Sequence, residues 1–539
     1  MTASDSADLV FLGASIETMV DGAPPADAVA VRDGRIIEVG HATDVRRLIG
    51  ARTRVIELDG ESLLPGFQDA HVHPISGGML ARSCDLHGMA DAAAYLDAIA
   101  SHAAAHPDRA WITGGGWLLT AFPGGEPAGA LLDAIVPDRP VLLHSHDGHV
   151  AWANGRALEI AGIDRTTPDP AGGRIVRDET GEPTGTLHDG AIDLLEPHLP
   201  TPTHEDLLDG LREGQRHLHA LGITAWQDAH VELAELAAYR AAAGSGWLTA
   251  RVVAALWWRR EAGLEQIGEF ERQRAESAIG RLRADSVKLM LDGILESRTA
   301  FMTAPYAGGS HRGTPFIDPD LLREAVIELD RRGFQAHFHA IGDGAVRLAL
   351  DAVAAARAAN GASDHRHHVS HIEVVHPDDV PRFGRLGVVA NLQPFWASDD
   401  DQMQTLRNPV LGPDRIGWQY PFGSLLRAGA TLAGGSDWTV TTANPLLEIE
   451  VAVTRVAPST RNAAPFQPDE RLSLDAALRA FTIGSAYVNH LDTDTGTIEV
   501  GKLADLVVLD RDIRAAGAGP IGDASVRATF IEGAEVFSA

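Results

Sequence analysis

Between residues 64 and 495, short apolar runs alternate with longer segments rich in Ala, Leu and Arg. Apolar runs of about four to eight residues are typical of buried strands, and the longer segments have the composition of helices. Alternating strands and helices predict a parallel sheet covered by helices. Eight strands of this kind predict a (β/α)8 TIM-type barrel, which is an α/β fold. The strands after the first are predicted at residues 223–228, 252–256, 287–291, 335–339, 369–374, 388–392 and 431–434.

The two ends of the chain share a different pattern, in which short alternating strands are broken by turns. Asp33-Gly34 stands between two such strands and is a strong hairpin signal, and Glu532-Gly533 marks a turn near the C-terminus. We therefore predict one small β-sandwich domain built from both termini, residues 1–63 and 496–539, beside a barrel domain of residues 64–495. The sandwich strands are predicted at 8–12, 28–31, 35–39 and 53–58, and within 501–510 and 526–537.

The segment that follows the first barrel strand, at about residues 77–221, is too long for a single strand-to-helix connection. It contains three turn-rich stretches of its own, at 114–117, 123–127 and 178–185. We therefore predict an inserted lobe. Insertions on the catalytic face of a barrel usually shape the access of substrate.

The charge of the chain limits its partners. It has 74 Asp and Glu residues against 45 Lys and Arg residues, a formal net charge of -29. Such an acidic chain is not expected to bind nucleic acid or an anionic membrane surface, and a small-molecule substrate fits it better. The sequence leaves the oligomeric state open, and a homo-oligomer is compatible with it.

Cys84 is the single cysteine, so an intrachain disulfide cannot form, which agrees with a reducing compartment. The first residues carry no basic leader, and no stretch approaches about 18 consecutive apolar residues. We expect a cytoplasmic protein.

The stretch Leu64-Pro65-Gly66-Phe67-Gln68-Asp69-Ala70-His71-Val72-His73-Pro74 carries the first candidate chemistry. Side chains two residues apart on a strand point the same way, so His71 and His73 face one spot at the end of the first strand. Two imidazoles that converge in this way suit a divalent metal, typically zinc. Ordinary surface or core histidines are the alternative, and further candidate ligands downstream favour the metal site.

Lys288 lies in the hydrophobic strand Ser286-Val287-Lys288-Leu289-Met290-Leu291. Burying a lysine is unfavourable unless the amine is neutralised or paired. One solution is carbamylation by carbon dioxide, which turns the amine into a carboxylate that bridges two metal ions. The other is an ion pair with a nearby acid such as Asp292, and the strand context alone does not separate the two.

Three later strands also end in ionisable residues. His337 and His339 form a second His-x-His pair; they point the same way, and His339 is favoured as a ligand because it lies closer to the mouth. His371 stands alone, as structural histidines often do. Asp437 follows the last strand, where it could bind metal, accept a proton from metal-bound water and pass it to a leaving nitrogen, or simply cap a helix.

The order of these residues along the strands resembles the amidohydrolase superfamily, and within it the branch that contains N-substituted formamide deformylase and the exoenzyme regulatory proteins. Together the similar motifs cover nearly the whole chain. They are Pro-Gly-Phe-x-Asp-Ala-His-x-His at 65–73, Ser145-His146-Asp147-Gly148-His149 with Trp152-Ala153-Asn154, Gly185-Thr186-Leu187, residues 288–300, His339-Ala340-Ile341-Gly342-Asp343, residues 434–437 and Gly501-Lys502-Leu503-Ala504-Asp505.

The resemblance implies a divalent metal, typically zinc, as one or two ions, with Asp437 as acid/base and possible ligand. The chain departs from many relatives at Trp396, where they carry histidine, and at Glu296, where they carry glycine. Substrate identity therefore cannot be transferred. The implied metal ligands are His71, His73, Lys288 as a carbamate, His339 and His371, and the candidate substrate contacts are His149, Trp117, Trp152, Arg298, Trp396 and Trp438; for each tryptophan, core packing is an equal alternative.

The expected function is that of a metal-dependent hydrolase that cleaves a C–N bond other than a peptide bond in a small organic substrate, using metal-activated water. A deaminase, a cyclic amidase or a lactonase on the same scaffold is one alternative. A catalytically silent regulatory or ligand-binding protein is another, although the complete set of candidate ligands argues against it.

Overall fold

The computed structural model describes residues 6–86, 89, 91–145, 150–170, 173–296, 298–399 and 403–539. The chain forms two compact units. The barrel unit comprises residues 1–74 and 215–539, and the inserted unit comprises residues 75–214. Each unit has its own sheets and its own hydrophobic core.

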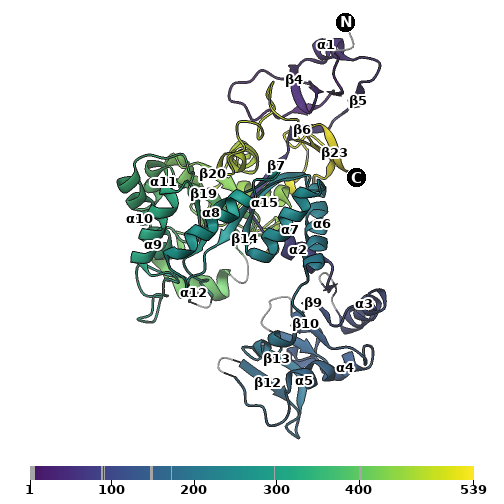
Figure 1. The fold of residues 1–539 in the computed structure, drawn as a ribbon, viewed down its shortest axis with the longest axis vertical. Coiled ribbons are helices and arrows are strands. Elements are labelled where there is room, and N and C mark those ends of the chain that lie inside the picture. The colour runs from purple at the N-terminus through teal and green to yellow at the C-terminus, as the bar shows by residue number, and fades with distance from the viewer. Residues whose placement is uncertain are drawn as a thin grey trace. The chain divides into compact units, whose positions relative to one another are not determined.

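The centre of the barrel unit is an eight-stranded parallel sheet with the order β20-β19-β18-β17-β16-β15-β14-β7 (Figure 1). Seven successive parallel pairings join the strands, and backbone contacts between the ends of β7 and β20 nearly close the barrel. The predicted TIM-type barrel is therefore confirmed. The strands are β7 (Phe67–Val72), β14 (Ile223–Val231), β15 (Arg251–Trp257), β16 (Leu282–Met290), β17 (Gln335–Ala340), β18 (His368–His371), β19 (Val389–Leu392) and β20 (Leu432–Gly434).

Helices between the strands cover the outside of the barrel, and α9 shows why they form. Asp318 accepts hydrogen bonds from the backbone N–H groups of Asp320 and Leu321, and Pro319 occupies the first turn. Leu322, Val326 and Leu329 then bury one face of the helix. The covering helices include α7 (Leu233–Gly244), α8 (Ile267–Glu276), α9 (Pro319–Arg331), α10 (Asp343–Asn360), α11 (Val380–Leu386), α14 (Phe422–Arg427) and α15 (Pro445–Thr454).

Each of the seven strands after the first differs from its predicted limits by at least one residue, and β16 and β18 differ most. β16 begins at Leu282, five residues before the predicted start at 287, because the polar residues of its first half still pair with β15. β18 ends at His371 instead of continuing to residue 374. His371 and Ile372 have φ values of 76° and 40°, in the left-handed region, and this conformation interrupts an extended strand.

The terminal segments form two sheets that share one core. Phe11 and Phe530 pack edge to face with ring centroids 5.1 Å apart, and the predicted turns at Asp33-Gly34 and Glu532-Gly533 have positive φ at both residues. The sheets have the orders β4-β3-β1-β5 and β2-β6-β21-β22-β23, with β1 (Leu9–Leu12), β2 (Ser15–Ile16), β3 (Ala28–Arg32), β4 (Arg35–Gly40), β5 (Arg54–Glu57), β6 (Ser62–Pro65), β21 (Leu506–Leu509), β22 (Val526–Ile531) and β23 (Ala534–Ser538). Both sheets belong to the barrel unit, so the predicted boundaries at 63/64 and 495/496 remain predictions.

The inserted unit covers residues 75–214, where the sequence predicts a lobe at about 77–221. Its six-stranded sheet buries Trp117, Trp152 and Phe122 together with one face of α3. The sheet has the order β12-β13-β11-β10-β9-β8, with β8 (Cys84–Asp85), β9 (Ile112–Trp117), β10 (Val141–Ser145), β11 (Val150–Ala153), β12 (Gly173–Arg177) and β13 (Pro183–Asp189), and the helices are α3 (Ala92–Ala105), α4 (Gly129–Asp133) and α5 (Gly155–Ala161).

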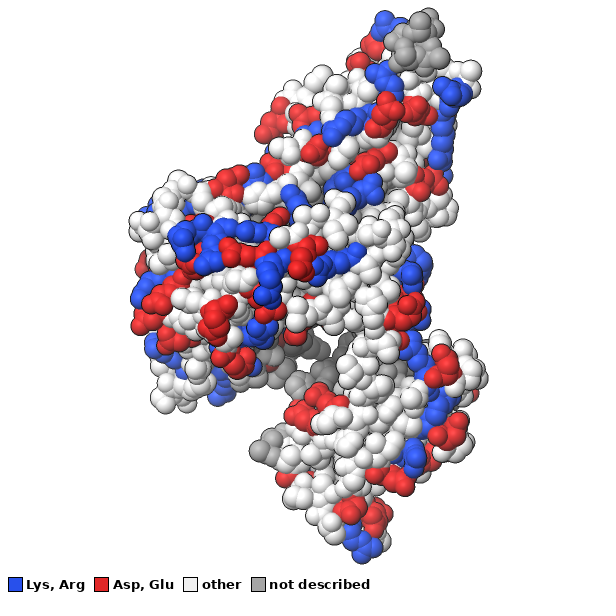
Figure 2. Space-filling model, in the orientation of Figure 1, with Lys and Arg blue, Asp and Glu red and all other residues white. Residues whose placement is uncertain are grey.

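The surface carries both basic and acidic side chains, as the composition of the sequence indicates. On the face drawn in Figure 2, Lys and Arg side chains lie next to Asp and Glu side chains and do not gather in one large basic patch. Within the described ranges, no helix combines the length and the apolar composition that crossing a membrane requires.

A buried ion pair connects the barrel to the terminal sheets. Arg251, the first residue of β15, donates from Nε to Asp505 Oδ2 over 2.9 Å and from Nη2 to Glu532 Oε1 over 2.9 Å. The same Asp505 accepts the Glu532 backbone N–H at its side chain and the Gly66 backbone N–H at its carbonyl oxygen. Burial raises the pKa of Asp505, and the positive charge of Arg251 opposes this effect. Asp505 therefore joins the start of β7 to β22 and β15.

Replacing Asp505 by alanine should lower the free energy of unfolding by about 3–5 kcal/mol, because it leaves the buried Arg251 without its main counter-ion. A matched control is Asp494→Ala, which removes an ion pair with Arg35 in which both side chains are 48% exposed. That variant should lose no more than about 1 kcal/mol. Urea denaturation of both variants measures the difference, and equal losses would contradict the assigned role of Asp505.

Candidate metal centre at the carboxyl ends of the barrel strands

Six sequence-predicted residues lie at or just beyond the carboxyl ends of the barrel strands. Because all eight strands are parallel, these ends meet at one mouth of the barrel, where barrel enzymes carry their active sites. The six residues are His71 in β7, His73 directly after it, Lys288 near the end of β16, His339 in β17, His371 at the end of β18 and Asp437 after β20.

Three of them form a tight group. Asp437 Oδ1 lies 3.0 Å from His73 Nε2 and 3.3 Å from His71 Nε2. One ligand atom from each of the three residues lies within 4.8 Å of the other two. Burial alone would raise the pKa of Asp437, but the contacts with His71 and His73 lower it well below its usual value. Asp437 is therefore a carboxylate held between two imidazoles. It does not cap a helix, since the next helix, α15, is capped by Asn444.

The backbone explains why the first and eighth strands deliver these groups to one point. The Asp437 N–H donates to His71 O over 2.8 Å, and the His73 N–H donates to Trp438 O over 2.9 Å. Asp437 has φ 53°, a left-handed conformation that a non-glycine residue adopts at a free-energy cost of about 1–3 kcal/mol. A side chain at Gly435 would place its Cβ 2.7 Å from His71 Cβ, so only glycine permits this close approach.

Asp69 stabilises the same contact between the first and eighth strands, a role that the sequence analysis missed. Its carboxylate accepts the His71 backbone N–H over 2.9 Å, the Ser436 backbone N–H over 3.1 Å and the Ser436 hydroxyl over 2.6 Å. Complete burial raises the pKa of Asp69 to about 7, against the lowering effect of these hydrogen bonds. The spacing of residues 69, 71 and 73 places three polar side chains on one face of the strand, and this is the signal that could have identified it.

Lys288 joins the group from β16. Its Nζ lies 3.2 Å from His71 Nε2, and the residue is 4% exposed. Burial lowers the pKa of Lys288 to about 7, although Asp437 and Asp228 act in the opposite direction. The alternative partner, Asp292, is engaged elsewhere: its carboxylate accepts the backbone N–H groups of Phe301, Ile341 and Gly342 over 2.8, 3.1 and 2.9 Å.

His339 and His371 approach the group from β17 and β18. Their ring centroids are 4.3 Å apart, and the His371 ring lies 4.8 Å from the His71 ring. Neither His339 Nε2 nor His371 Nδ1 has a hydrogen-bond partner among the described residues, although both atoms are buried. Burial, with a further contribution from Lys288, lowers the pKa of His71 and of His339 to about 3. These imidazoles are therefore neutral and keep lone pairs available.

Such a donor set fits a divalent metal ion. Neutral imidazoles with a carboxylate are ligands that suit zinc and other transition-metal ions. Buried nitrogens without hydrogen-bond partners are unfavourable unless some other group satisfies them. The unpartnered nitrogens of His339 and His371 are thus explained if they face a bound cation.

His337, the second histidine of its pair, occupies a different place. Its Nε2 lies 3.0 Å from His71 Nδ1, the nitrogen on the far side of the His71 ring from Asp437 and Lys288. His337 is fully buried, and the same Nε2 atom lies 2.9 Å from the hydroxyl oxygen of Ser370. The structure therefore separates His337, which contacts the back of His71, from His339, which contacts His371.

Asp228 is another residue near the site that the sequence analysis did not select. It lies in β14, with Oδ1 4.0 Å from His73 Nδ1, and Tyr239 donates its hydroxyl to Oδ2 over 2.7 Å. Burial raises the pKa of Asp228 to about 6. Its position at the end of the predicted strand 223–228 was the available signal, because acidic residues at such ends face the barrel mouth.

The proposed substrate contacts lie in different environments. Trp396 stacks on His371 with ring centroids 5.3 Å apart and planes 5° apart, and its Nε1–H donates to Thr441 Oγ1 over 3.2 Å. Trp438 stacks on His217 at 4.6 Å. Arg298 is exposed in the segment after β16 and has φ 58°.

Two other candidates belong to the inserted segment. Trp117 is completely buried and donates its Nε1–H to Leu143 O over 2.9 Å, and Trp152 is equally buried and donates to Ala128 O over 3.0 Å. Their position in the core of the inserted unit explains both tryptophans by packing, the alternative role that the sequence allowed. His149 lies outside the described residues.

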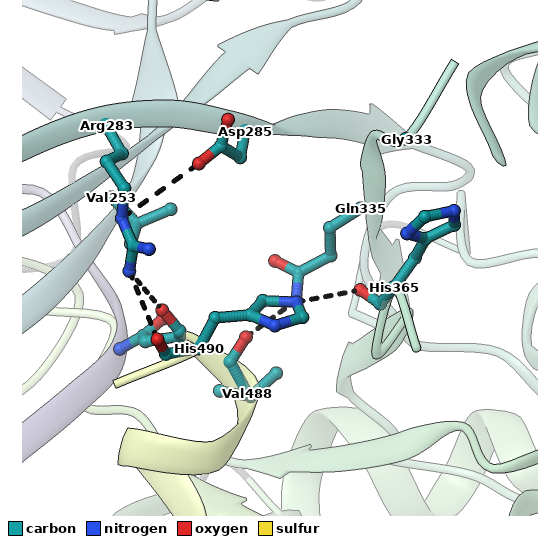
Figure 3. A pocket seen from close by; sticks show the side chains of 9 residues that line it. Val253, Arg283, Asp285, Gly333, Gln335, His365, Val488 and His490 are labelled. Carbon is teal, nitrogen blue, oxygen red and sulfur yellow. Dashed lines mark hydrogen bonds and ion pairs between the residues drawn. The ribbon is translucent and has the colours of Figure 1, made fainter. Parts of the chain in front are cut away.

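A cavity of about 250 Å³ lies at the opposite end of the barrel (Figure 3). Its lining includes Val253, Arg283 and Gln335, which stand in the first residues of β15, β16 and β17. Residues at the amino ends of barrel strands usually serve stability. The candidate site therefore lies at the other end, where the histidines converge.

Known proteins are similar to this chain over most of its length. The chain is similar to the protein LONG AFTER FAR-RED 3 of Arabidopsis thaliana, with 32% identity over 98% of this chain and 92% of that protein. It is 27% identical to the N-substituted formamide deformylase of Arthrobacter pascens, over 98% of this chain and 97% of that enzyme. The solved structure of an uncharacterized metal-dependent hydrolase from Pyrococcus furiosus superimposes with a TM-score of 0.75 at 26% identity, covering 94% of this chain and 99% of that one. Residues 54–537 match the model of the amidohydrolase family, and the chain belongs to that family.

Proposed function

We propose that this protein is a metal-dependent hydrolase that cleaves an amide-type C–N bond in a small organic substrate. The observation that carries the proposal is the position of Asp437, with Oδ1 3.0 Å from His73 Nε2 and 3.3 Å from His71 Nε2. A carboxylate at this position can serve both a bound cation and a proton transfer. The similarity to N-substituted formamide deformylase, whose name denotes the cleavage of an amide, supports the choice of bond.

The residues that would hold the metal are His71, His73, His339 and His371, with Lys288 as a carbamate and Asp437 as a further possible ligand. Zinc, as one or two ions, suits this set of nitrogen and oxygen donors. When bound, a divalent ion lowers the pKa of a water molecule towards neutrality and polarises a substrate carbonyl.

Within such a site, Asp437 is the group that accepts a proton and returns it to the leaving nitrogen. It is held by its own backbone N–H, which donates to His71 O, and by the contacts of its carboxylate with the two imidazoles. A general acid/base must be fixed within hydrogen-bond reach of the proton it transfers, and these contacts fix Asp437. His73 is 23% exposed at its side chain, so the group opens towards the mouth.

Two residues near the candidate site bear on the choice of substrate. Trp396 presents an aromatic surface over His371, at one of the two positions where the family resemblance implies a different residue. At the other position, Glu296 accepts a hydrogen bond from Arg407 Nε over 2.5 Å. Arg407 also donates to Tyr420 Oη over 2.7 Å, so Glu296 is tied into a charged cluster in the segment beyond β16. Because Trp396 and Glu296 differ from the residues that the family resemblance implies, we expect a substrate preference different from that of relatives.

The function is tested by combining a substrate panel with the variant Asp437→Asn. Zinc-loaded enzyme should release amine from at least one class among N-formyl amines, N-acyl amines and N-acyl amino acids. On that substrate, Asp437→Asn should lower turnover by about 10²- to 10⁴-fold, because asparagine keeps the size of the side chain but cannot accept the proton. The metal content should change little.

Asp285→Asn is the matched control, since it makes the same chemical change at the opposite end of the barrel and should leave turnover unchanged. Hydrolysis of lactones alone would refute cleavage of a C–N bond. Full turnover by Asp437→Asn would refute its role as the acid/base, and loss of metal from that variant would make Asp437 primarily a ligand.

Lys288→Ala should lose both metal and activity, because Lys288 would supply a carboxylate ligand as a carbamate. Short carboxylates such as acetate should partly restore activity to this variant but not to Asp437→Ala. Lys288 and Lys502 are the only two lysines in the chain, so a carbamate is easily assigned. Holoenzyme exposed to ¹³C-labelled carbon dioxide should show one carbamate NMR resonance that is absent from Lys288→Ala; wild-type activity in that variant would rule out the role.

A further inference from the structure

The two ring nitrogens of His71 face different surroundings. On one side, Nε2 lies 3.2 Å from Lys288 Nζ and 3.3 Å from Asp437 Oδ1, so it points into the candidate metal centre. On the other side, Nδ1 lies 3.0 Å from His337 Nε2. The ring is thus held between the cluster at the barrel mouth and a second imidazole deeper in the barrel.

This arrangement fixes the position of the protons if His71 binds a metal. A neutral imidazole carries one proton, and the nitrogen that coordinates a metal must offer a lone pair. Coordination through Nε2 therefore requires the proton on Nδ1, which needs an acceptor. His337 Nε2 is at hydrogen-bond distance from it. Histidines that bind metals usually donate this second N–H to a carboxylate, carbonyl or water, and here an imidazole stands in that place.

His337 packs against His368, and its Nε2 also lies 2.9 Å from Ser370 Oγ. Its ring lies 4.0 Å from the ring of His368, and His368 Nε2 lies 3.0 Å from Gln227 Oε1. Asn391 Nδ2 is 3.1 Å from the other nitrogen of His368. His337 Nδ1 has no partner among the described residues, so the contacts of Nε2 with His71 Nδ1 and Ser370 Oγ are the ones that bear on its tautomer. With its proton on Nδ1, His337 offers a lone pair on Nε2 to the His71 N–H, at the cost of a buried Nδ1–H without an acceptor among those residues.

We propose that His337 is a positioning residue that accepts the Nδ1 proton of His71 and so keeps His71 Nε2 ready to coordinate the metal. The proposal rests on the metal centre proposed above. His337 lies beside Lys288 in the β16–β17 register, one inward-facing position below His339. It acts on the metal through His71 and is not itself a ligand.

A pair of variants that differ by one methylene tests this role. His337→Gln can place its side-chain carbonyl oxygen near the position of Nε2 and accept the proton. His337→Asn carries the same amide but stops near the position of Nδ1, too short to reach His71. The dissociation constant for Zn²⁺ is measured on the metal-stripped full-length chain by competition with a chelator. The value for His337→Gln should stay close to that of the wild type, whereas His337→Asn should bind about 10- to 100-fold more weakly.

Each other result overturns the proposal. Unchanged affinity in His337→Asn would show that the proton needs no acceptor at this position. A similar loss in both variants would show that His337 acts by its ring shape or as a ligand. If His337→Asn does not fold, the His337→Gln variant still decides, since a tenfold loss in it contradicts the role. Failure of the wild-type chain to bind Zn²⁺ would refute the metal centre itself, a result distinct from the others.

Discussion

The candidate site depends on the joint between the first and eighth strands of the barrel. Two backbone hydrogen bonds make this joint, from Asp437 N–H to His71 O and from His73 N–H to Trp438 O. Asp69 adds three hydrogen bonds beneath it. Because the same residues close the barrel and carry the candidate ligands, closure of the fold and assembly of the site are one event. This also explains why the site draws on residues separated by more than 360 positions in the chain.

The joint concentrates features that are unfavourable in an ordinary protein core. Asp437, His371 and Ile372 have left-handed backbone conformations, and several buried histidine nitrogens lack hydrogen-bond partners within the described part of the chain. Each strained residue costs about 1–3 kcal/mol and persists only where the surrounding structure imposes it. Here the parallel ladder of eight strands and the hydrogen bonds of Asp69 to His71 and Ser436 provide that support. The strained backbone and the unpartnered histidine nitrogens both lie at the barrel mouth. Features that lower stability are expected at a functional site.

Much of this architecture could be predicted from the sequence, because its signals are local. The alternation of apolar runs and helical segments predicted every strand of the barrel, and the period of two placed His71 and His73 side by side. Other features depend on neighbours that the sequence does not reveal. The roles of Asp69 and Asp228, the contact of His337 with the back of His71 and the early end of β18 all follow from contacts between strands. For Trp117 the sequence left a substrate contact and core packing as alternatives, because a tryptophan pattern cannot distinguish a core from a pocket.

The metal content of the purified full-length chain tests the central claim most directly, since every proposed role refers to one metal centre at the barrel mouth. Elemental analysis after gentle purification should find one to two equivalents of a divalent transition-metal ion, with zinc the expected element. A site with this many nitrogen and oxygen donors should retain its ion through purification. Less than about half an equivalent of any such metal, in protein that is folded and has not been exposed to chelators, would contradict the claim.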